Sequence, residues 1–300
     1  MHMDTLFTRN DNLHRTLKPV PGGQMSAVHF GDIDTPVKLV FLHATGFHGL
    51  AYRSILDALG VHVIALDLRG HGGTDLPTNI DKIASFHTYA EDVGAYLDAH
   101  VPERVLLSGH SLGASCAILA ASKAPDKISK VLAFDPVVLP FPIRMIMASK
   151  FGRRRLQETF PLARMAGRRR DIFSSLEAAY KRFHGRGPFK HFSNEALWDY
   201  VCGGFVEQGG EETGVRLTCR PKWEQFTYTA QGHNLKSAIG TLPADSRILI
   251  TDFVKPVSWI APMQKKCPHI SIEPHMELEH FFPLINPEIS IPALLDMLKD

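Results

Sequence analysis

Cysteine is scarce in this chain and is spread along it. The 300 residues include four cysteines, at positions 116, 202, 219 and 267. No two of them have the spacing of a Cys-x-x-Cys metal or redox motif, and four are too few for a disulfide framework in a chain of this length. We therefore expect reduced thiols, a cytoplasmic location and no metal site.

Long apolar runs are also missing. No stretch approaches the roughly 20 apolar residues that a membrane-spanning helix needs. A charged residue already stands at position 4, so residues 1–4 do not begin the apolar core of a signal peptide. The composition, with 44% hydrophobic and 21% charged residues, is ordinary for a globular protein. The sequence therefore predicts neither a membrane span nor a signal peptide.

The overall charge is close to balanced, but its distribution is uneven. The formal net charge is +2, yet residues 138–240 contain 17 lysines and arginines against 9 aspartates and glutamates. Two runs of three arginines, at 153–155 and 168–170, belong to this segment. A solvated helical surface is the simpler explanation. Attraction of anionic substrates or of a membrane surface is the alternative, and both stay open at this point.

In the first and the last part of the chain, apolar runs rich in β-branched residues alternate with segments whose apolar residues recur at helical spacing. An opening hairpin of residues 13–20 and 24–31 precedes expected strands at 37–43, 61–68, 105–108, 128–134, 247–251 and 270–273. Expected helices lie at 52–59, 86–99, 114–122 and 287–298. Strands that alternate with helices predict an α/β fold with a doubly wound, mostly parallel sheet.

The alternation stops after residue 136 and resumes near residue 245. Between them, from about 141 to 240, the chain is basic, rich in aromatic residues and helical, without buried β runs. An insertion between two strands of one sheet is simpler than a tandem second domain. We predict a core domain of residues 1–137 and 241–300, and a helical cap, or lid, of residues 138–240.

A five-residue stretch, Gly109-His110-Ser111-Leu112-Gly113, joins an expected strand to an expected helix. In a G-x-S-x-G turn with this context, the serine adopts a strained backbone conformation and its hydroxyl is exposed above the sheet edge. The strand and the helix pack closely at this turn, and the glycines leave room for that packing because they have no side chain. We therefore predict that Ser111 is a catalytic nucleophile in a nucleophile elbow.

Three further motifs surround this turn in a fixed order. They are Leu42-His43-x-x-Gly46-Phe47, Asp67-Leu68-Arg69-Gly70-His71-Gly72 and Glu279-His280-Phe281-Phe282-Pro283-Leu284. With these motifs the chain resembles the α/β-hydrolase family, in the form that carries an inserted cap. The resemblance covers residues 13–137 and 245–300. It implies the fold but not the substrate, because one scaffold hosts many reactions.

The resemblance places the catalytic base at His280, in the loop after the last expected strand. A nucleophilic serine needs such a base, held in turn by an acid. Two nearby histidines, His275 and His269, lack the His-x-x-Pro-Leu context of this position. Three other histidines match motif positions that are usually structural, namely His43, His71 and His110.

Two aspartates compete for the role of the acid. The common family position lies a few residues after the strand 247–251, where Asp252 comes slightly early. Some family members instead carry the acid at the end of the preceding strand, which here is Asp135. We favour Asp135 and keep Asp252 as the alternative.

The resemblance also assigns an oxyanion hole to two backbone N–H groups, those of Thr45 and Leu112. Such donors stabilise negative charge that develops on the substrate oxygen. The loop departs from the commoner His-Gly pair, because Ala44 follows His43. The loop must therefore avoid, at Ala44, a backbone angle that only glycine tolerates.

Together these residues predict a serine hydrolase that cleaves a carboxylic ester, thioester, lactone or related acyl bond. A serine at the elbow argues against haloalkane dehalogenases and epoxide hydrolases, which use a carboxylate there. A hydrolase of carbon–carbon bonds would use the same residues, and a non-catalytic ligand-binding member of the fold is the rival from another class. We expect a small, partly apolar substrate as the partner, with no cofactor and no nucleic acid; a homo-oligomer is not predicted.

The cap contains more aromatic residues than a thin helical layer needs for its own packing. Ligand sites are largely apolar clefts and often lie at domain junctions. We therefore expect some of these rings to contact the substrate, and name Trp198, Trp223 and Phe226 as candidates.

Overall fold

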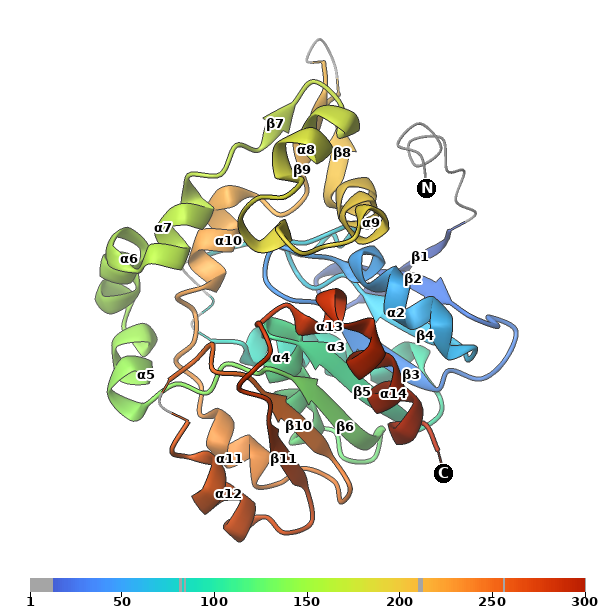
Figure 1. Ribbon diagram of the computed structural model, residues 1–300, viewed down its shortest axis with the longest axis vertical. Helices are drawn as coiled ribbons and strands as arrows, with labels where there is room; N and C mark the ends of the chain where they lie inside the picture. Colours follow the sequence, from blue (N-terminus) through green and yellow to red (C-terminus); the bar gives the residue numbers. More distant parts are fainter. Residues whose placement is uncertain (1–12, 81–82, 84, 210–212, 256, 300) are drawn as a thin grey trace.

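The protein is built on one twisted sheet that crosses its lower half (Figure 1). The computed structural model describes residues 13–80, 83, 85–209, 213–255 and 257–299. Residues 1–12, where the sequence shows no signal core, lie outside the described residues. Within the described residues the sheet has eight strands in the order β1-β2-β4-β3-β5-β6-β10-β11. Strand β2 pairs antiparallel with β1 and β4, and the other pairs are parallel.

Each strand expected from the sequence is present. The strands are β1 (His14–Val20), β2 (Gly23–Phe30), β3 (Leu39–Leu42), β4 (Val63–Leu66), β5 (Val105–His110), β6 (Ile128–Phe134), β10 (Arg247–Ile250) and β11 (Ser271–Pro274). Helices connect the parallel strands and cover both faces of the sheet. The predicted α/β fold with a doubly wound, mostly parallel sheet is therefore confirmed.

The apolar runs are continuous because both faces of the sheet are buried. Successive side chains of a strand point to opposite faces. In β3, Val40 and Leu42 belong to one hydrophobic core, and Leu39 and Phe41 to another on the other side. Helices on both sides supply the rest of these cores, as is usual for parallel sheets.

The helices divide between the two cores. One core includes residues of α3 (His87–His100), α4 (Leu112–Ala121), α11 (Leu235–Ile239) and α12 (Ile260–Lys266). The other includes residues of α2 (Arg53–Leu56), α13 (Phe282–Ile285) and α14 (Pro287–Met297). None of the helices in the described part of the chain has both the length and the apolar character needed to cross a bilayer.

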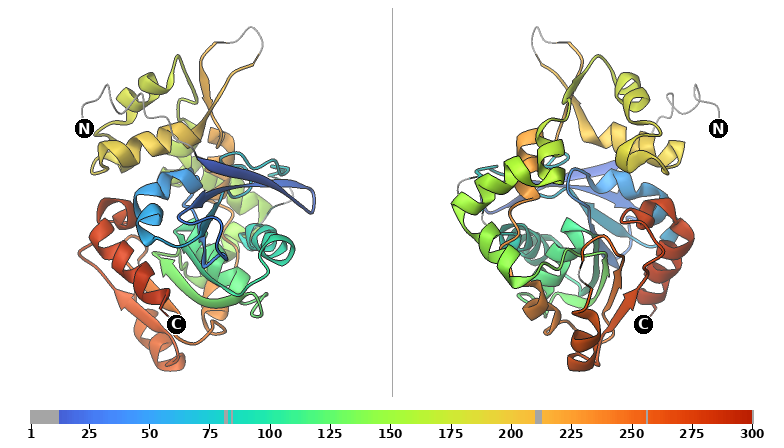
Figure 2. Two further views of the ribbon diagram at one scale, coloured as in Figure 1. Left: turned by 90° about the vertical axis from the view of Figure 1, so that its right-hand side faces the viewer. Right: turned by 60° about the vertical axis from the view of Figure 1, so that its left-hand side comes forward.

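The segment inserted after β6 forms a separate layer above the carboxyl ends of the strands (Figures 1 and 2). Its helices are α5 (Phe141–Ala148), α6 (Lys150–Thr159), α7 (Pro161–Gly167), α8 (Leu176–Phe183), α9 (Asn194–Gly204) and α10 (Pro221–Thr227), with a short 3-10 helix at Gly187–Phe189. A small antiparallel sheet of β7 (Ile172–Phe173), β9 (Val215–Leu217) and β8 (Phe205–Glu207) also lies among the described residues of this layer.

Two details of this layer differ from the sequence-based expectation. The cap is not purely helical, because its short strands pair with one another; runs of two or three residues give no recognisable alternation. Helix α11 lies within residues 138–240 but packs against α4 and joins a sheet core. The chain thus returns to the core before residue 241.

Candidate active site

Ser111 lies in the sharp turn between β5 and α4. Its backbone angles are φ 56° and ψ −109°, which is a strained conformation for a residue other than glycine. The turn is held because the Ser111 backbone N–H donates to the Phe134 carbonyl oxygen at 2.9 Å. A Cβ on Gly113 would lie 2.1 Å from the Leu42 carbonyl oxygen, so a side chain there would collide with β3. The glycine of the motif is therefore needed for close packing of the helix on the sheet.

Three side chains at this edge of the sheet form one chain of hydrogen bonds. The distance from Ser111 Oγ to His280 Nε2 is 3.0 Å, and from His280 Nδ1 to Asp135 Oδ2 it is 2.5 Å. The carboxylate can only accept, so Nδ1 carries the proton and donates it. Nε2 is then free to accept from the serine hydroxyl. The imidazole is therefore oriented as a general base for Ser111.

Asp135 is fixed by two elements of the sheet. It follows β6 with φ 49°, and it accepts hydrogen bonds from the Thr251 N–H at 2.8 Å and the Thr251 hydroxyl at 2.6 Å. Burial raises the pKa of Asp135, but the hydrogen bonds from His280 and Thr251 outweigh it and hold this pKa below its usual range. The group therefore stays ionised beside the imidazole.

The other candidate acid points away from this chain of hydrogen bonds. Asp252 is half-exposed and forms an ion pair with Lys255 at 3.1 Å. The structure thus brings Asp135, rather than Asp252, to His280. Sequence reasoning missed Thr251; its only signal was a polar residue that ends the apolar run of β10.

The motif histidines His43, His71 and His110 are buried and support the surrounding loops. Burial lowers the pKa of His43 to about 4 and that of His71 and His110 to about 3, so all three are neutral at pH 7. His110 Nδ1 accepts from the Tyr52 hydroxyl at 2.7 Å, which leaves Nε2–H to donate to the His280 carbonyl oxygen at 2.8 Å. This bond fixes the backbone of His280.

Neither of the two histidines near His280 in sequence reaches Ser111 in this arrangement. The His275 ring faces Glu273 and Glu277, at 3.9 and 3.5 Å. His269 lies next to the amino end of β11, at the opposite edge of the sheet from the hydroxyl of Ser111.

Thr45 lies in the loop after β3, and Leu112 directly follows Ser111 as the first residue of α4. Among the described residues, no acceptor is assigned to the N–H of Thr45 or Leu112, while their neighbour Gly46 donates to His71 Nε2 at 3.1 Å. The positive φ of this loop falls on Gly46, at 77°, and not on Ala44. This explains how the loop accommodates alanine in place of the commoner glycine.

The cap contacts the same loop through a buried charged network. The Tyr200 hydroxyl donates to the Gly46 carbonyl oxygen at 3.2 Å and accepts from Arg169 at 2.8 Å. Arg169 also donates to Glu224 at 2.7 Å. Burial raises the pKa of Glu224 above its usual range despite the ion pair. These residues, which no local motif marks, join the cap to the loop that carries Thr45.

An aromatic cluster forms a second contact between the cap and the core. The Phe47 ring lies 5.2 Å from Phe281, 4.9 Å from Tyr200, 6.0 Å from Phe189 and 6.2 Å from Phe192. Phe47 follows the loop that carries Thr45, and the Phe281 ring lies 5.2 Å from that of His280, so the cluster borders His280. Phe192 and Phe281 are only partly buried.

The three cap residues named from the sequence are all buried. The Trp198 ring lies 6.0 Å from that of Tyr180, another cap residue. Trp223 donates from Nε1 to the Arg69 carbonyl oxygen at 3.0 Å, and the Phe226 ring lies 5.4 Å from that of Trp223. Trp223 thus contacts a loop at the edge of the sheet.

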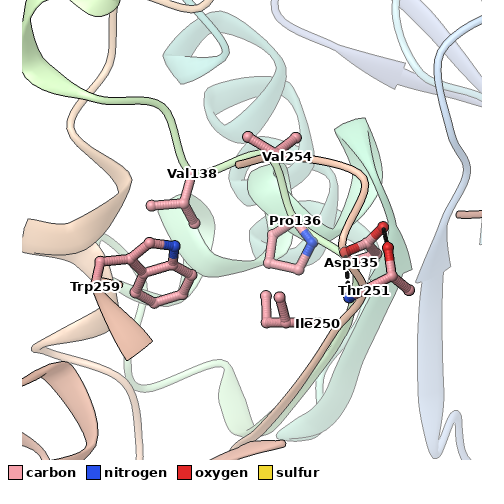
Figure 3. A pocket seen from close by; sticks show the side chains of 7 residues that line it. All are labelled: Asp135, Pro136, Val138, Ile250, Thr251, Val254 and Trp259. Carbon is pink, nitrogen blue, oxygen red and sulfur yellow. Dashed lines mark hydrogen bonds between the residues drawn. The ribbon is translucent and has the colours of Figure 1, made fainter. Parts of the chain in front are cut away.

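A small cavity touches the acid of the triad (Figure 3). Its volume is about 10 Å³, which is room for roughly one water molecule. The Phe253 ring stacks on the His280 ring with 3.8 Å between the centroids. The cavity is lined by Asp135, Pro136, Val138, Ile250, Thr251, Val254 and Trp259.

Within the part of the chain that the structure describes, no group of three or more histidine, cysteine or acidic side chains could hold a metal ion. The hydrogen bonds place the Ser111 hydroxyl, the His280 imidazole and the ionised Asp135 carboxylate in one line.

The fold and this set of residues are those of an α/β-hydrolase. The sequence profile of the Alpha/beta hydrolase family matches residues 39–253, which is more than half of the chain. The protein therefore belongs to the alpha/beta hydrolase family.

Similarity to individual proteins is lower. Protein ABHD8 of Homo sapiens is 34% identical over 102 residues, which cover 33% of this chain and 23% of that protein. Monoglyceride lipase of Homo sapiens is 31% identical over 116 residues, 36% of this chain and 38% of that enzyme. The match therefore spans less than two fifths of the length of either curated relative.

A solved structure with a similar fold is that of E-2-(acetamidomethylene)succinate hydrolase. The TM-score is 0.72 at 19% sequence identity, and the alignment covers 95% of this chain and 98% of that one. At this identity the likeness concerns the fold. The cap layer is included in it, because nearly all of both chains is aligned.

Proposed function

We propose that the protein is a serine hydrolase that cleaves a carboxylic ester or a related acyl bond, such as a thioester or lactone. Ser111 attacks the carbonyl carbon while His280 takes its proton, and the N–H groups of Thr45 and Leu112 hold the oxyanion. Protonated His280, supported by Asp135, then gives its proton to the leaving group. Water activated by His280 releases the acid from the acyl-enzyme.

The observation that carries this proposal is the unbroken line of hydrogen bonds from Ser111 to Asp135. A serine hydroxyl is a weak nucleophile unless a base is placed to remove its proton. Here the base is 3.0 Å away and its tautomer is set by a buried carboxylate. A ligand-binding protein would have no use for this order of groups.

Labelling with a fluorophosphonate probe tests the proposal. We expect one adduct, on Ser111, detected by mass spectrometry of the folded protein, because the probe reacts with activated serines. The probe should leave Ser115, which also lies in this region, unmodified. Absence of any adduct on the folded protein would favour a binding protein over a hydrolase. A panel of p-nitrophenyl esters beside a vinylogous diketone then identifies the bond that is cleaved.

Substrate must reach a serine that is buried beneath the cap. Ser111 is 7% exposed. We infer that the cap moves to admit the substrate and closes over it, which excludes water from the reaction. The aromatic cluster around Phe47 lies where such movement would occur.

We expect cap side chains that reach the site loops to affect substrate preference, and those that stay inside the cap to affect only stability. Replacing Trp223 by phenylalanine removes its bond to the Arg69 carbonyl, and Phe192→Leu alters the cluster beside His280. Both variants should change KM several-fold across a series of p-nitrophenyl esters of increasing acyl length. Trp198→Phe is the matched control because Trp198 is equally buried.

The profile of kcat/KM against chain length measures this effect. If the Trp223 and Phe192 variants keep the wild-type profile, while their melting temperatures fall, these rings are packing residues. The same comparison applies to Phe226, whose ring contacts that of Trp223.

A further inference from the structure

The excess of positive charge in the cap is confined to its first part. Residues 138–170 contain nine lysines and arginines and a single acidic residue, Glu158. Residues 171–240 contain eight basic and eight acidic residues and are balanced. The excess therefore belongs to α5, α6, α7 and the turn that follows. These helices lie along one outer edge of the molecule (Figures 1 and 2).

The same helices expose large apolar side chains. Six of the fourteen large hydrophobic residues that are exposed in the described part of the chain fall between residues 141 and 165. Phe151 is 83% exposed, Met165 65% and Phe141 64%. The other three are Ile143, Met145 and Ile146. A concentration of this kind is unusual on a protein surface and marks an interaction site.

The apolar side chains are held outward by the packing of α5 on α6. The Arg153 guanidinium is buried and donates to the carbonyl oxygens of Met147 and Ala148 at the end of α5, at 3.1 and 2.9 Å. The Ser149 hydroxyl caps α6 by accepting from the Gly152 N–H at 2.8 Å. A Cβ on Gly152 would collide with the last turn of α5. The exposed residues therefore lie on a fixed surface.

We propose that this surface binds the face of a lipid bilayer that contains anionic lipids. The docking face consists of Phe141, Ile143, Met145, Ile146, Phe151 and Met165 with the exposed basic residues Lys150, Arg154 and Arg155. Apolar side chains enter the boundary between headgroups and acyl chains, and lysines and arginines are attracted by the negative surface potential.

The charge of the docking face favours a lipid surface over a protein partner. An anionic membrane attracts a face that carries basic residues and almost no acidic ones. Here Glu158 is the single acidic residue between 138 and 170, and it pairs with Arg155 at 3.9 Å. Helix α5 begins six residues after Asp135. Binding to lipid would not depend on the proposed hydrolysis.

Flotation of the full-length protein with lipid vesicles tests the proposal. The protein should float with vesicles of phosphatidylcholine and phosphatidylserine, and not with phosphatidylcholine alone. Arg154→Gln/Arg155→Gln should lower the partition coefficient by about tenfold, because each basic residue near an anionic surface contributes. Phe151→Ser should lower it several-fold. High salt, which shortens the screening length from about 8 Å toward 3 Å, should release the protein.

Two control variants make the same kinds of substitution at other exposed residues, outside the docking face. Lys265→Gln/Lys266→Gln removes two adjacent exposed charges from α12, and Leu17→Ser removes an exposed apolar residue from β1. Both should float like the wild type. The proposal is wrong if the controls lose as much binding as the cap variants, or if no flotation occurs at low salt. It is also wrong if sedimentation shows a dimer that Phe151→Ser dissociates, since the face would then join two copies of the chain.

Discussion

Replacing Ser111 by alanine should lower kcat on a p-nitrophenyl ester by roughly five to six orders of magnitude, because the nucleophile is lost. His280→Ala should have an effect of similar size, since the serine hydroxyl then lacks its base. Triad members act as a unit, so the double variant should be little worse than either single one. Steady-state kinetics with the three proteins measures this.

A neighbouring histidine serves as the control. His275→Ala removes an imidazole five residues before His280 that faces Glu273 and Glu277 instead of Ser111. This variant should keep near-normal turnover. Circular dichroism should show that all the variants are folded, because neither Ser111 nor His280 is part of the hydrophobic cores. Near-normal activity of Ser111→Ala would show that another residue is the nucleophile.

The sheet could be predicted from the sequence because its signals are local. Each parallel strand is a short apolar run that is buried on both faces, and β3 and β4 illustrate this with every residue buried. The prediction of one helix at 52–59 agrees less well with the structure than the predictions of the strands do. The structure breaks it into α2 and flanking 3-10 turns, which end at Gly60 with φ 67°. Boundaries of this kind depend on tertiary packing.

The contact between Ser111 and His280 could also be predicted, because each lies in a short motif. The acid could not be settled in the same way. Strands β6 and β10 are neighbours in the sheet, so Asp135 and Asp252 both follow strand ends at the same edge. Which carboxylate turns inward depends on the φ of 49° at Asp135 and on its two bonds to Thr251. The spacing of residues along the chain contains no information on these contacts.

The cap was the least predictable part. Its aromatic residues occur at helical spacing whether they pack within the cap or reach the core. Tyr200 contacts Gly46 across 154 positions in the sequence, and the ring of Trp198, two residues earlier, contacts that of Tyr180 within the cap. Long-range pairs of this kind are set by how the inserted layer rests on the sheet. The motifs of the core contain no information on that placement.

We expect Asp135→Asn to lower kcat by about four orders of magnitude and Asp252→Asn to change it less than threefold. The amide can donate to Nδ1, so it would stabilise the tautomer in which Nε2 carries the proton. Nε2 could then not accept from Ser111, and the imidazolium would lose its counter-charge. Asp252 is half-exposed and pairs with the exposed Lys255 side chain, so its loss should leave His280 oriented.

The rate of fluorophosphonate labelling measures the same difference without a substrate. It should fall strongly in Asp135→Asn and stay unchanged in Asp252→Asn, because labelling needs the base but not acyl-enzyme hydrolysis. Thr251→Val provides a graded control, since it removes the hydroxyl that bonds to Asp135 and leaves the N–H bond in place. Its effect should lie between the two aspartate variants. The opposite order, with Asp252→Asn the more damaging, would assign the acid to the loop after β10 and leave Asp135 as a turn residue.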